Sequence, residues 1–371
     1  MSTHHQLPTP DDLRALDGDF AGAVSVYVET SPQPSERERA QVALKSGFDA
    51  ALRELDEHGV DRGVRESIAA ARDAILDDHE LWGKLSRALA VFAAPGVSEV
   101  FVLPNQLEDE VHAGVHFAVG QLLRSVTQPQ EAFAITLSEN AWGLWHATAE
   151  ERVAPIELAG TYPGSAAEAT NRDAAGRGDD RLSGDVHDLY AKRVADAART
   201  ELARLDPDEK LTLFMFADET IAAQFGQRKD GRRLVSIPGN PDRINAAQID
   251  GEIREQLAAL NVADTEAELE ALGDGDPGRM ERDLAAIARQ AVSGAVDTFW
   301  FDVTRDVWGT LDPASGELTY ERTADLFAPA VSDLLAKVAL LVLDQGGRVV
   351  AVRPDHLGDA WEGPALARLR Y

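Results

Sequence analysis

The chain has 371 residues, with 36 Lys and Arg against 64 Asp and Glu, and a formal net charge of −28. This charge opposes general binding to nucleic acids, because such binding gains affinity when basic side chains neutralise phosphates. We therefore expect no DNA partner, and any RNA contact has to be local. The absence of cysteine excludes disulfides, thiolate metal ligands and a cysteine nucleophile.

The targeting features of the sequence point to an acidic, cytoplasmic protein. No apolar run reaches the length of a membrane span, and the N-terminus lacks the basic and then apolar pattern of a secretory leader. We therefore expect no membrane partner. The length predicts two or three domains, each able to bury a core.

The N-terminal part, residues 1–128, predicts an α+β domain. Residues 22–30 alternate apolar and polar side chains, as a half-buried strand does. Ser35 and Glu38 have the spacing of a capping box ahead of a long amphipathic helix that ends at Gly59. The remaining expected elements are a helix at 63–77, two strands around a Pro-Gly turn at 87–104 and mostly helix at 107–126.

The middle part, residues 129–262, predicts an α/β domain. Two apolar runs within 131–147 flank a Ser-Glu-Asn turn, which indicates a hairpin. Residues 159–184 carry almost no large apolar side chain and predict a long loop, of a length that is generally functional or disordered. A helix is expected at 185–205, with this buried face: Val186, Leu189, Tyr190, Val194, Ala197 and Ala198.

The rest of the middle part is predicted from one apolar run and two helical patterns. Residues 210–218 are typical of a strand buried on both faces. Helices are expected at 219–225 and 245–260, with a basic turn between them. The acidic, Gly- and Pro-containing stretch 261–280 predicts a linker or an exposed excursion.

The C-terminal part, residues 281–371, alternates helical and strand patterns, which predicts a layered α/β domain. The expected elements are a helix at 281–294, a strand at 297–303, a helix at 329–337 and strands at 338–344 and 348–352. Gly346 and Gly347 separate the last two and predict a tight hairpin turn.

The usual sequence motifs of metal and nucleotide sites are weak or missing. His4–His5 is an isolated pair. His112 and His116 have the i, i+4 spacing that can chelate zinc on a helix, but they lack the Glu of a zinc-peptidase motif. We favour ordinary helix histidines. We find no Walker loop, dinucleotide-binding glycine motif or nucleophile elbow, and expect no metal and no cofactor.

A basic cluster interrupts the acidic chain. Arg228, Lys229, Arg232 and Arg233 place four positive charges within six residues. Two interpretations stay open: a solvated loop tip, or a contact to RNA phosphates.

The order of several segments resembles the bacterial archaeo-eukaryotic release factor family, relatives of the eukaryotic and archaeal class-one peptide chain release factors. Each segment alone is short, and their order and spacing carry the resemblance through most of the chain. The segments are "AVSVYVET", "DDHELWGKLSRALAVFAAPGVSEVFVLP", "HFAVGQLL", "EAFAITLSENAWGLWHA", "DLYAKRVADAARTEL", "LTLFMFAD", "SIPGNPDRINAAQI", "AVSGAVDTFWFD", "LAKVALLVLDQGGRVVAV" and "PALARLRY".

The resemblance implies three parts: the N-terminal α+β domain, a ribonuclease-H-like middle domain and an L7Ae-like C-terminal α/β/α sandwich. It also implies a partner, the ribosome, through ribosomal or transfer RNA. In release factors a Gly-Gly-Gln loop ahead of a long helix of the middle domain helps water attack the ester that joins peptide to transfer RNA. The stretch "AAGRGDDRLSG" lies at that place in this chain.

Here the loop departs from the family pattern. Gly176, Arg177 and Gly178 match it, but Asp179 and Asp180 stand where the family has Gly and Gln. A Gln amide both donates and accepts hydrogen bonds, whereas an ionised Asp only accepts. The codon-reading Asn-Ile-Lys-Ser motif is absent as well. We therefore expect a release-factor-like protein of termination or rescue that does not hydrolyse peptidyl-transfer RNA.

The two aspartates leave other functions open. If hydrolysis occurs, Asp179 or Asp180 has to orient water as a general base. One alternative is a binding or regulatory protein unrelated to translation, and a weaker one is a metal-dependent nuclease that uses the same two carboxylates. The Arg-Gly-Asp at 177–179 suggests cell adhesion only in an exported protein, which we do not expect here.

Overall fold

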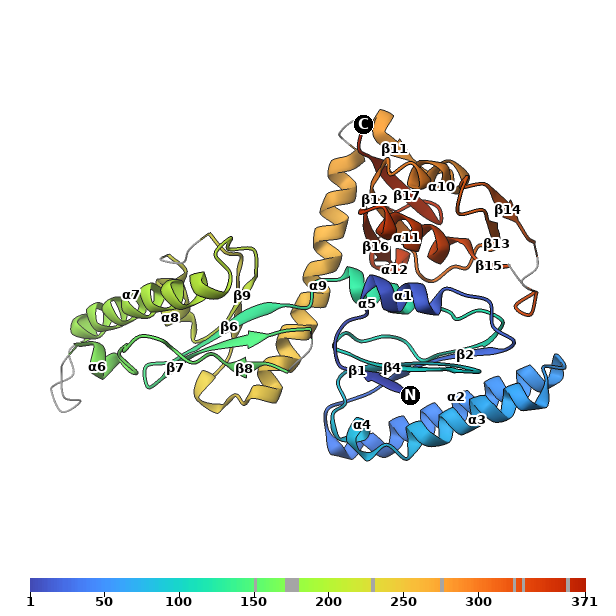
Figure 1. Cartoon of the computed structure of the whole chain (residues 1–371). Helices are drawn as coiled ribbons and strands as arrows, with labels where there is room; N and C mark the ends of the chain where they lie inside the picture. Colours follow the sequence, from blue (N-terminus) through green and yellow to red (C-terminus); the bar gives the residue numbers. More distant parts are fainter. Residues whose placement is uncertain are drawn as a thin grey trace. The chain divides into compact units, whose positions relative to one another are not determined.

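The computed structural model describes residues 1–149, 152–170, 180–227, 231–273, 277–322, 325–328, 331–357 and 361–371. Side chains at 170, 180–186, 273, 277 and 356 lie outside this description. The chain divides into two compact units, which we name unit 1 (Met1–Pro129 with Ala258–Tyr371) and unit 2 (Gln130–Leu257) (Figure 1). The expected mixed α/β class with several sheets is confirmed, and the division into three domains stays a prediction.

The N-terminal part of unit 1 is built on a five-stranded sheet in the order β1-β4-β3-β2-β5. Its strands are β1 (Ser2–His4), β2 (Ala23–Glu29), β3 (Ala88–Ala94), β4 (Val97–Leu103) and β5 (Glu110–Gly114). Its helices are α1 (Pro10–Leu16), α2 (Arg37–Glu57), α3 (Arg62–Leu76), α4 (His79–Gly83) and α5 (Gly120–Thr127). The expected strands at 22–30 and 87–104 and the helix at 63–77 are confirmed.

This sheet is covered on both faces. Alternate residues of β2 enter different cores, because successive side chains of a strand point to opposite faces. Val24 and Val26 join the cluster that contains Leu44 and Phe48 of α2, and Tyr27 joins a second cluster. Figure 1 shows α2 and α3 running side by side along the first of these faces.

The predicted capping box at Ser35 is wrong. A 3₁₀ turn, η1 (Pro34–Glu36), occupies this position, and α2 begins at Arg37 without a side-chain cap. Pro34 stands at the first position of that turn, which its fixed φ favours. A true capping box was missed ahead of α1, where Thr9 and Asp12 bond each other's backbone N–H.

The expected helix over 107–126 is wrong in its first half. Residues 110–114 form β5, which pairs antiparallel with β2 and places His112 opposite Ser25. Only α5 is helical, so His112 lies on a strand and His116 follows it. The long-range pairing with β2 overrides the local helical pattern, as strand formation often does.

The C-terminal part of unit 1 has a four-stranded sheet in the order β11-β17-β12-β16 and a small sheet in the order β14-β13-β15. The strands are β11 (Met280–Glu281), β12 (Val296–Asp302), β13 (Trp308–Leu311), β14 (Leu318–Tyr320), β15 (Ser332–Asp333), β16 (Arg348–Val352) and β17 (Ala365–Leu369). The helical elements are η3 (Pro277–Arg279), α10 (Leu284–Val292), α11 (Leu334–Asp344) and α12 (Pro354–Leu357).

The predicted strand at 338–344 is wrong, because this run is the greater part of helix α11. Asp333 caps it by accepting hydrogen bonds from the backbone N–H groups of Leu335 and Ala336. Seven of its eleven residues are buried, and a helix that is apolar on all sides has the same sequence pattern as a buried strand. The Gly346–Gly347 turn therefore connects a helix to β16, which runs parallel to β12, and not two strands of a hairpin.

The predicted linker at 261–280 is also wrong over most of its length. Residues 261–273 continue α9 (Ala246–Gly273), a helix of 28 residues that belongs to unit 2 at its start and to unit 1 at its end. Its acidic side chains had suggested an exposed segment. Val262, Leu269 and Leu272 instead pack against the cluster around Trp300 of β12.

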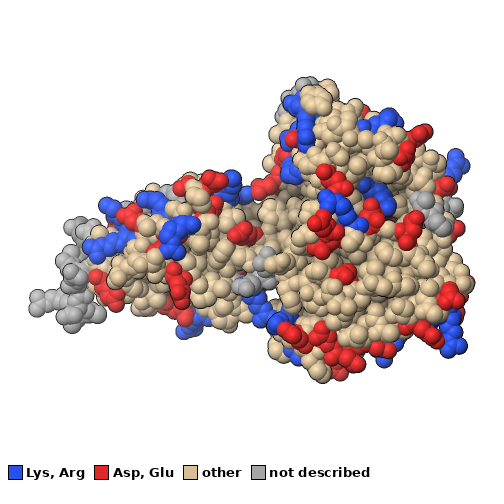
Figure 2. Space-filling model, in the orientation of Figure 1, with Lys and Arg blue, Asp and Glu red and all other residues tan. Residues whose placement is uncertain are grey.

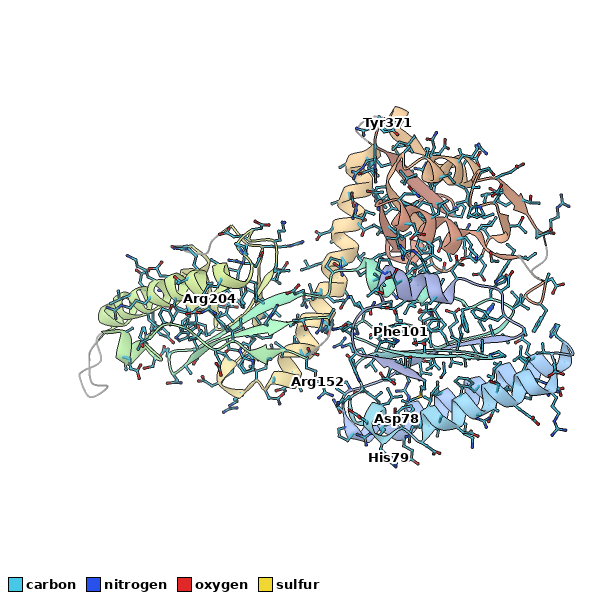
Figure 3. The ribbon with its side chains drawn as sticks, in the orientation of Figure 1. Asp78, His79, Phe101, Arg152, Arg204 and Tyr371 are labelled. Carbon is cyan, nitrogen blue, oxygen red and sulfur yellow. The ribbon has the colours of Figure 1, made fainter. Side chains whose placement is uncertain are left out.

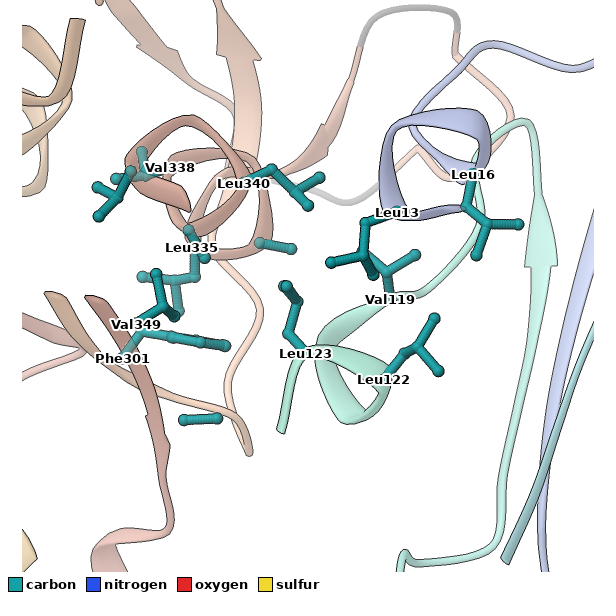
Figure 4. Packing of buried hydrophobic residues seen from close by; sticks show 14 of the residues in the cluster. Leu13, Leu16, Val119, Leu122, Leu123, Phe301, Leu335, Val338, Leu340 and Val349 are labelled. Atoms are coloured by element: carbon teal, nitrogen blue, oxygen red, sulfur yellow. The ribbon is translucent and has the colours of Figure 1, made fainter. Parts of the chain in front are cut away.

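The N- and C-terminal parts of unit 1 share one hydrophobic core. Leu13 and Leu16 of α1 and Leu122 and Leu123 of α5 belong to the same cluster as Leu335 of α11 (Figure 4). At the edge of this core, Arg14 Nε donates to Asp344 Oδ1 at 2.8 Å.

Unit 2 is a mixed sheet in the order β10-β9-β6-β7-β8 with helices packed on it. Its strands are β6 (Ala132–Leu137), β7 (Trp142–Ala147), β8 (Ala154–Pro155), β9 (Leu213–Ala217) and β10 (Leu234–Pro238). Its helical elements are α6 (Ala166–Thr170), α7 (Asp180–Leu205), α8 (Glu219–Gly226), η2 (Pro241–Arg243) and the start of α9. The hairpin at 131–147 and the fully buried strand within 210–218 are confirmed, whereas β10 was missed.

Candidate functional site

The residues of the expected loop fall partly outside the structural description. Gly176, Arg177, Gly178 and Asp179 are not among the described residues. Asp180 is the first residue of α7, and its side chain is not described. The prediction of one continuous loop over 159–184 is wrong at two places. Helix α6 forms within it, and α7 begins five residues before the expected helix start at 185.

Helix α7 is fixed to the sheet by its apolar face. Tyr190, Val194, Ala197 and Ala198 are buried, as predicted. Leu189 is 38% exposed, so its place on that face was wrong. The side chain of Val186 lies outside the description. The segment 171–179 therefore leads into a helix whose later turns are held firmly in the core.

A buried carboxylate ties the segment 159–162 to α7. Glu201 Oε1 accepts hydrogen bonds from the backbone N–H of Ala159 (2.9 Å) and Gly160 (3.1 Å) and from the Tyr162 hydroxyl (2.9 Å). Arg204, labelled on α7 in Figure 3, donates to its Oε2 at 2.9 Å. Burial alone would raise the pKa of Glu201, but the Ala159 N–H, the Tyr162 hydroxyl, the Gly160 N–H and the Arg204 charge offset it and lower the pKa.

A second polar cluster joins the β6–β7 turn to η2. Ser138 Oγ donates to Asp242 Oδ1 at 2.5 Å, and Asn140 Nδ2 donates to Oδ2 at 2.9 Å. These two hydrogen bonds, Ser138 first, lower the pKa of Asp242. In the same turn, Glu139 pairs with His187 of α7 at 2.8 Å. The turn thus contacts both the early part of α7 and the segment before α9.

The cluster holds one buried hydroxyl without a partner. Tyr190 is fully buried, and no described residue accepts from or donates to its hydroxyl. Burial, together with the carboxylates of Asp242 and Glu168, raises its pKa above the ordinary range. The phenol therefore keeps its proton at ordinary pH.

The outer face of α7 is basic. Lys192, Arg193, Arg199 and Arg204 are exposed there. Arg199 and Arg204 pair with carboxylates three residues before them. Lys192 and Arg193 make no ion pair with any residue that the structure describes. Figure 2 shows Lys and Arg side chains gathered on the visible face of unit 2.

The predicted basic cluster is divided between the surface and the interior. Arg228 and Lys229 are outside the described residues, and Arg233 is exposed. Arg232 is 1% exposed and lies 3.4 Å from Asp206 through Nε and Oδ2, with its guanidinium over the Phe133 ring at 6.0 Å. In this arrangement the positive charge of Arg232 is paired with Asp206 inside unit 2. The RNA contact stays a prediction for the other three residues.

The histidine pairs do not assemble a metal centre. His112 is on β5, and His4 pairs with Glu99 at 2.6 Å and stacks on Phe101. Among the residues that the structure describes, no three His, Asp or Glu side chains converge as metal ligands. Within the same ranges, no helix has the length and apolar character needed to cross a membrane.

The sequence prediction missed the groups that hold α7 in place. Arg204 follows Glu201 by three residues, which is the spacing of an ion pair on a helix, so this pair could have been predicted from the sequence. Lys192 and Arg193 lie between the buried Ala191 and Val194, so the helical period alone places them on the outer face. The Ser138–Asp242 contact joins residues 104 positions apart and has no local signal.

Comparison with known proteins finds similarity at the level of solved structures. No protein-family model matches the chain, and no curated protein matches its sequence. The chain is similar to a ribosome-bound archaeal Pelota solved with ABCE1, with a TM-score of 0.38 and 13% identity over 99% of this chain and 95% of that one.

Two further solved structures are similar over nearly the whole chain. Archaeoglobus fulgidus Pelota gives a TM-score of 0.34 and 12% identity, covering 98% of this chain and 92% of that one. The archaeal translation termination factor aRF1 gives 0.24 and 14%, covering 97% and 96%. The function proposed below rests on residues of the present chain, because these scores and identities are low.

Proposed function

We propose that this chain is a release-factor-like protein that associates with the ribosome through unit 2 and does not hydrolyse peptidyl-transfer RNA. The observation that carries the proposal is the distribution of apolar and basic side chains on α7, together with the sequence before it. Gly176, Arg177 and Gly178, which match the release-factor loop, precede this helix, and the helix combines a buried apolar face with an exposed basic one.

The anchoring of α7 supports a role in presenting the preceding segment. Glu201 fixes residues 159–162 on one side, and the Glu139–His187 pair fixes an early turn of α7 on the other. Sites placed on rigid elements keep their geometry better than sites on unsupported loops. The segment 171–179 would then reach its target from a firmly held base.

The exposed basic residues supply the local RNA contact that a chain of net charge −28 needs. Lys192 and Arg193 have no carboxylate partner among the described residues, so phosphates do not have to displace one. Arg233 adds an exposed positive charge after the basic turn. Each phosphate that a basic side chain neutralises releases counterions and strengthens binding at low salt.

The chemistry of Asp179 and Asp180 argues against hydrolysis. The release-factor mechanism needs a neutral amide beside the ester, and an ionised carboxylate lacks the donor. A carboxylate is also repelled by the RNA phosphates it would approach. We therefore assign binding without turnover, and the chain would occupy the ribosome as a rescue or regulatory factor.

The test is sedimentation with purified ribosomes in sucrose gradients at low salt. The chain is expected to co-migrate with ribosomes or subunits, and the variant Lys192→Glu/Arg193→Glu is expected to lose about tenfold or more in affinity, with a shallower salt dependence. Lys45→Glu/Arg53→Glu is the matched control, because it makes the same charge change on the exposed face of α2. A chain that never co-migrates is a binding protein outside translation.

A second assay separates binding from catalysis. Stalled ribosomes that carry peptidyl-transfer RNA are incubated with the chain, and peptide release is followed. We expect the peptide to be retained. Release that disappears in Asp179→Ala/Asp180→Ala would instead show that the two carboxylates act as the catalytic groups.

A further inference from the structure

Unit 1 contains a cavity of about 90 Å³ between its N- and C-terminal parts. β5 and α5 supply one side of it, and the segment after β12 together with α11 supplies the other. Phe117, Val119, Phe301 and Leu340 form its apolar wall, and three of these four side chains are labelled in the packing view (Figure 4, without Phe117). An engineered cavity of about 150 Å³ holds a benzene molecule, so this one has room for a smaller group.

Four carboxyl groups line this cavity: Asp17, which pairs with Lys337, and three others. Glu110 comes from β5, Asp306 from the segment after β12, and Asp333 from the start of α11. Desolvation raises the pKa of these three. Asp306 nevertheless keeps an exposed edge, whereas Glu110 and Asp333 are half-buried. The Asp306 carboxylate adds to the rise at both Glu110 and Asp333, so it lies within electrostatic reach of both.

Two of these carboxyls are already satisfied. Glu110 Oε2 accepts from Gln121 Nε2 at 2.6 Å. Asp333 accepts from the backbone N–H groups of Val307, Leu335 and Ala336, each at 3.1 Å. Asp306 makes no hydrogen bond or ion pair with any residue within the described ranges. It is the carboxylate of this group that still lacks a partner.

The cations of the cavity wall are engaged elsewhere. Lys337 pairs with Asp17, and Arg305 Nε lies 3.1 Å from Asp302 Oδ2. His112 adds no charge, because burial lowers its pKa to about 4. Neither nearby cation therefore neutralises Asp306.

A second acceptor in the wall also lacks a donor. His116 lines the cavity, and its Nδ1 lies 3.1 Å from the Gly18 carbonyl oxygen. Nδ1 also lies 3.3 Å from Asp19 Oδ1. Both oxygens only accept, so Nδ1 carries a proton, and in the neutral ring Nε2 offers a lone pair. This Nε2 is buried and has no partner among the described residues. Among the described residues, Asp306 thus has no cationic partner and His116 Nε2 has no N–H donor.

We propose that this cavity binds a small organic cation with N–H donors, an alkylguanidinium or alkylammonium compound, with Asp306 as its counter-ion. The charge would lie near Asp306, and its N–H groups would supply the missing hydrogen bonds. Trp308 and Phe117 in the wall would contact the alkyl group, and an aromatic ring attracts a cation that lies over its face. The site is in unit 1, so it is independent of the ribosome contact proposed for unit 2.

Isothermal titration of the full chain with methylammonium and with methylguanidinium, both smaller than benzene, at low ionic strength tests the site. We expect one site per chain, and binding at least tenfold weaker in Asp306→Asn. Glu317→Gln should leave binding unchanged, because it removes one negative charge from an exposed position between β13 and β14, outside the cavity wall. Tetramethylammonium, which has the charge without N–H donors, should bind at least tenfold more weakly than methylguanidinium.

Asp306→Glu keeps the negative charge, and it should bind the ligand within a few-fold of the unaltered chain. This variant tests the site even if Asp306→Asn destabilises the protein. Absence of binding by the unaltered chain at millimolar ligand would overturn the proposal. So would equal binding by the unaltered chain and Asp306→Asn, or equal binding of tetramethylammonium and methylguanidinium. None of these results depends on ribosome association, so the two proposals fail separately.

Discussion

Asp333 is the N-cap of α11, and two opposing effects act on its carboxyl. Burial raises its pKa to about 7, and the neighbouring Asp306 adds to the rise. Three backbone N–H groups donate to it, and these favour the charged form. Burial outweighs them, so the folded protein holds a proton on Asp333 at pH values where the unfolded chain has already released it.

The sign of the pH dependence follows from this difference. Between pH 4 and 7 the unfolded state binds fewer protons than the folded state, so the free energy of unfolding falls as pH rises through this window. The pKa lies roughly 3 units above its ordinary value, which corresponds to at most about 4 kcal/mol at and above pH 7. Asp333→Asn removes this cost.

The Asp333→Asn variant also loses one backbone hydrogen bond. The Asn oxygen can accept from Val307 and Leu335, but its amide nitrogen cannot accept from Ala336. One lost hydrogen bond costs about 1 kcal/mol. We therefore expect Asp333→Asn to be more stable than the unaltered chain by roughly 2–3 kcal/mol at pH 8, and less stable by about 1 kcal/mol at pH 4.

Urea unfolding at intervals between pH 4 and 8, followed by tryptophan fluorescence, measures the difference. Asp283→Asn is the matched control, since Asp283 is an exposed N-cap of the neighbouring α10 and Asn caps a helix about as well as Asp. A difference that stays constant with pH would refute the reasoning. It would mean that the three N–H groups and the helix dipole keep Asp333 ionised.

Three further outcomes are expected in unit 2. Arg232→Met should lower the free energy of unfolding by about 3 kcal/mol in chemical denaturation, because it leaves the buried Asp206 without its cation; an unchanged midpoint would contradict this. Tyr190→Phe should raise stability by about 1 kcal/mol in the same assay, since it removes a buried hydroxyl without a described partner, and a loss would reveal a partner. Glu201→Gln should speed proteolysis and hydrogen exchange at residues 159–162, while the Glu157→Gln control should not.

Much of the fold could be predicted where the residues of one element are enough to identify its type. β2, β3, β4, the β6–β7 hairpin, β9 and β12 were all expected close to their observed bounds, because alternation or a short apolar run identifies a strand locally. The apolar face of α7 was mostly right for the same reason, since Tyr190 and Val194 follow the helical period.

The errors have two physical sources. Residues 338–344 and 110–114 were assigned the wrong element type, because burial on all sides or pairing with a distant strand decides the structure there. The stretch 261–273 was taken for a linker from its acidic composition, although Leu269 and its neighbours give the helix a packing face. Local sequence carries neither the partner strand nor the packing surface.

The sites show the same limits. Arg232 was grouped with its exposed neighbours, and only the fold places it against Asp206. The cavity of unit 1 brings Glu110 and Asp306 together across nearly two hundred residues of sequence. The two histidines at 112 and 116 were noticed for their spacing. In the structure burial lowers the pKa of His112, and His116 Nδ1 donates to the Gly18 carbonyl oxygen.

The central claim is that unit 2 carries a ribosome contact on the outer face of α7. Co-sedimentation with purified ribosomes, compared between the unaltered chain, Lys192→Glu/Arg193→Glu and the Lys45→Glu/Arg53→Glu control, tests it most directly. The account predicts that the unaltered chain and the control travel with ribosomes while the α7 variant stays at the top of the gradient. Co-migration of all three, or of none, would contradict it.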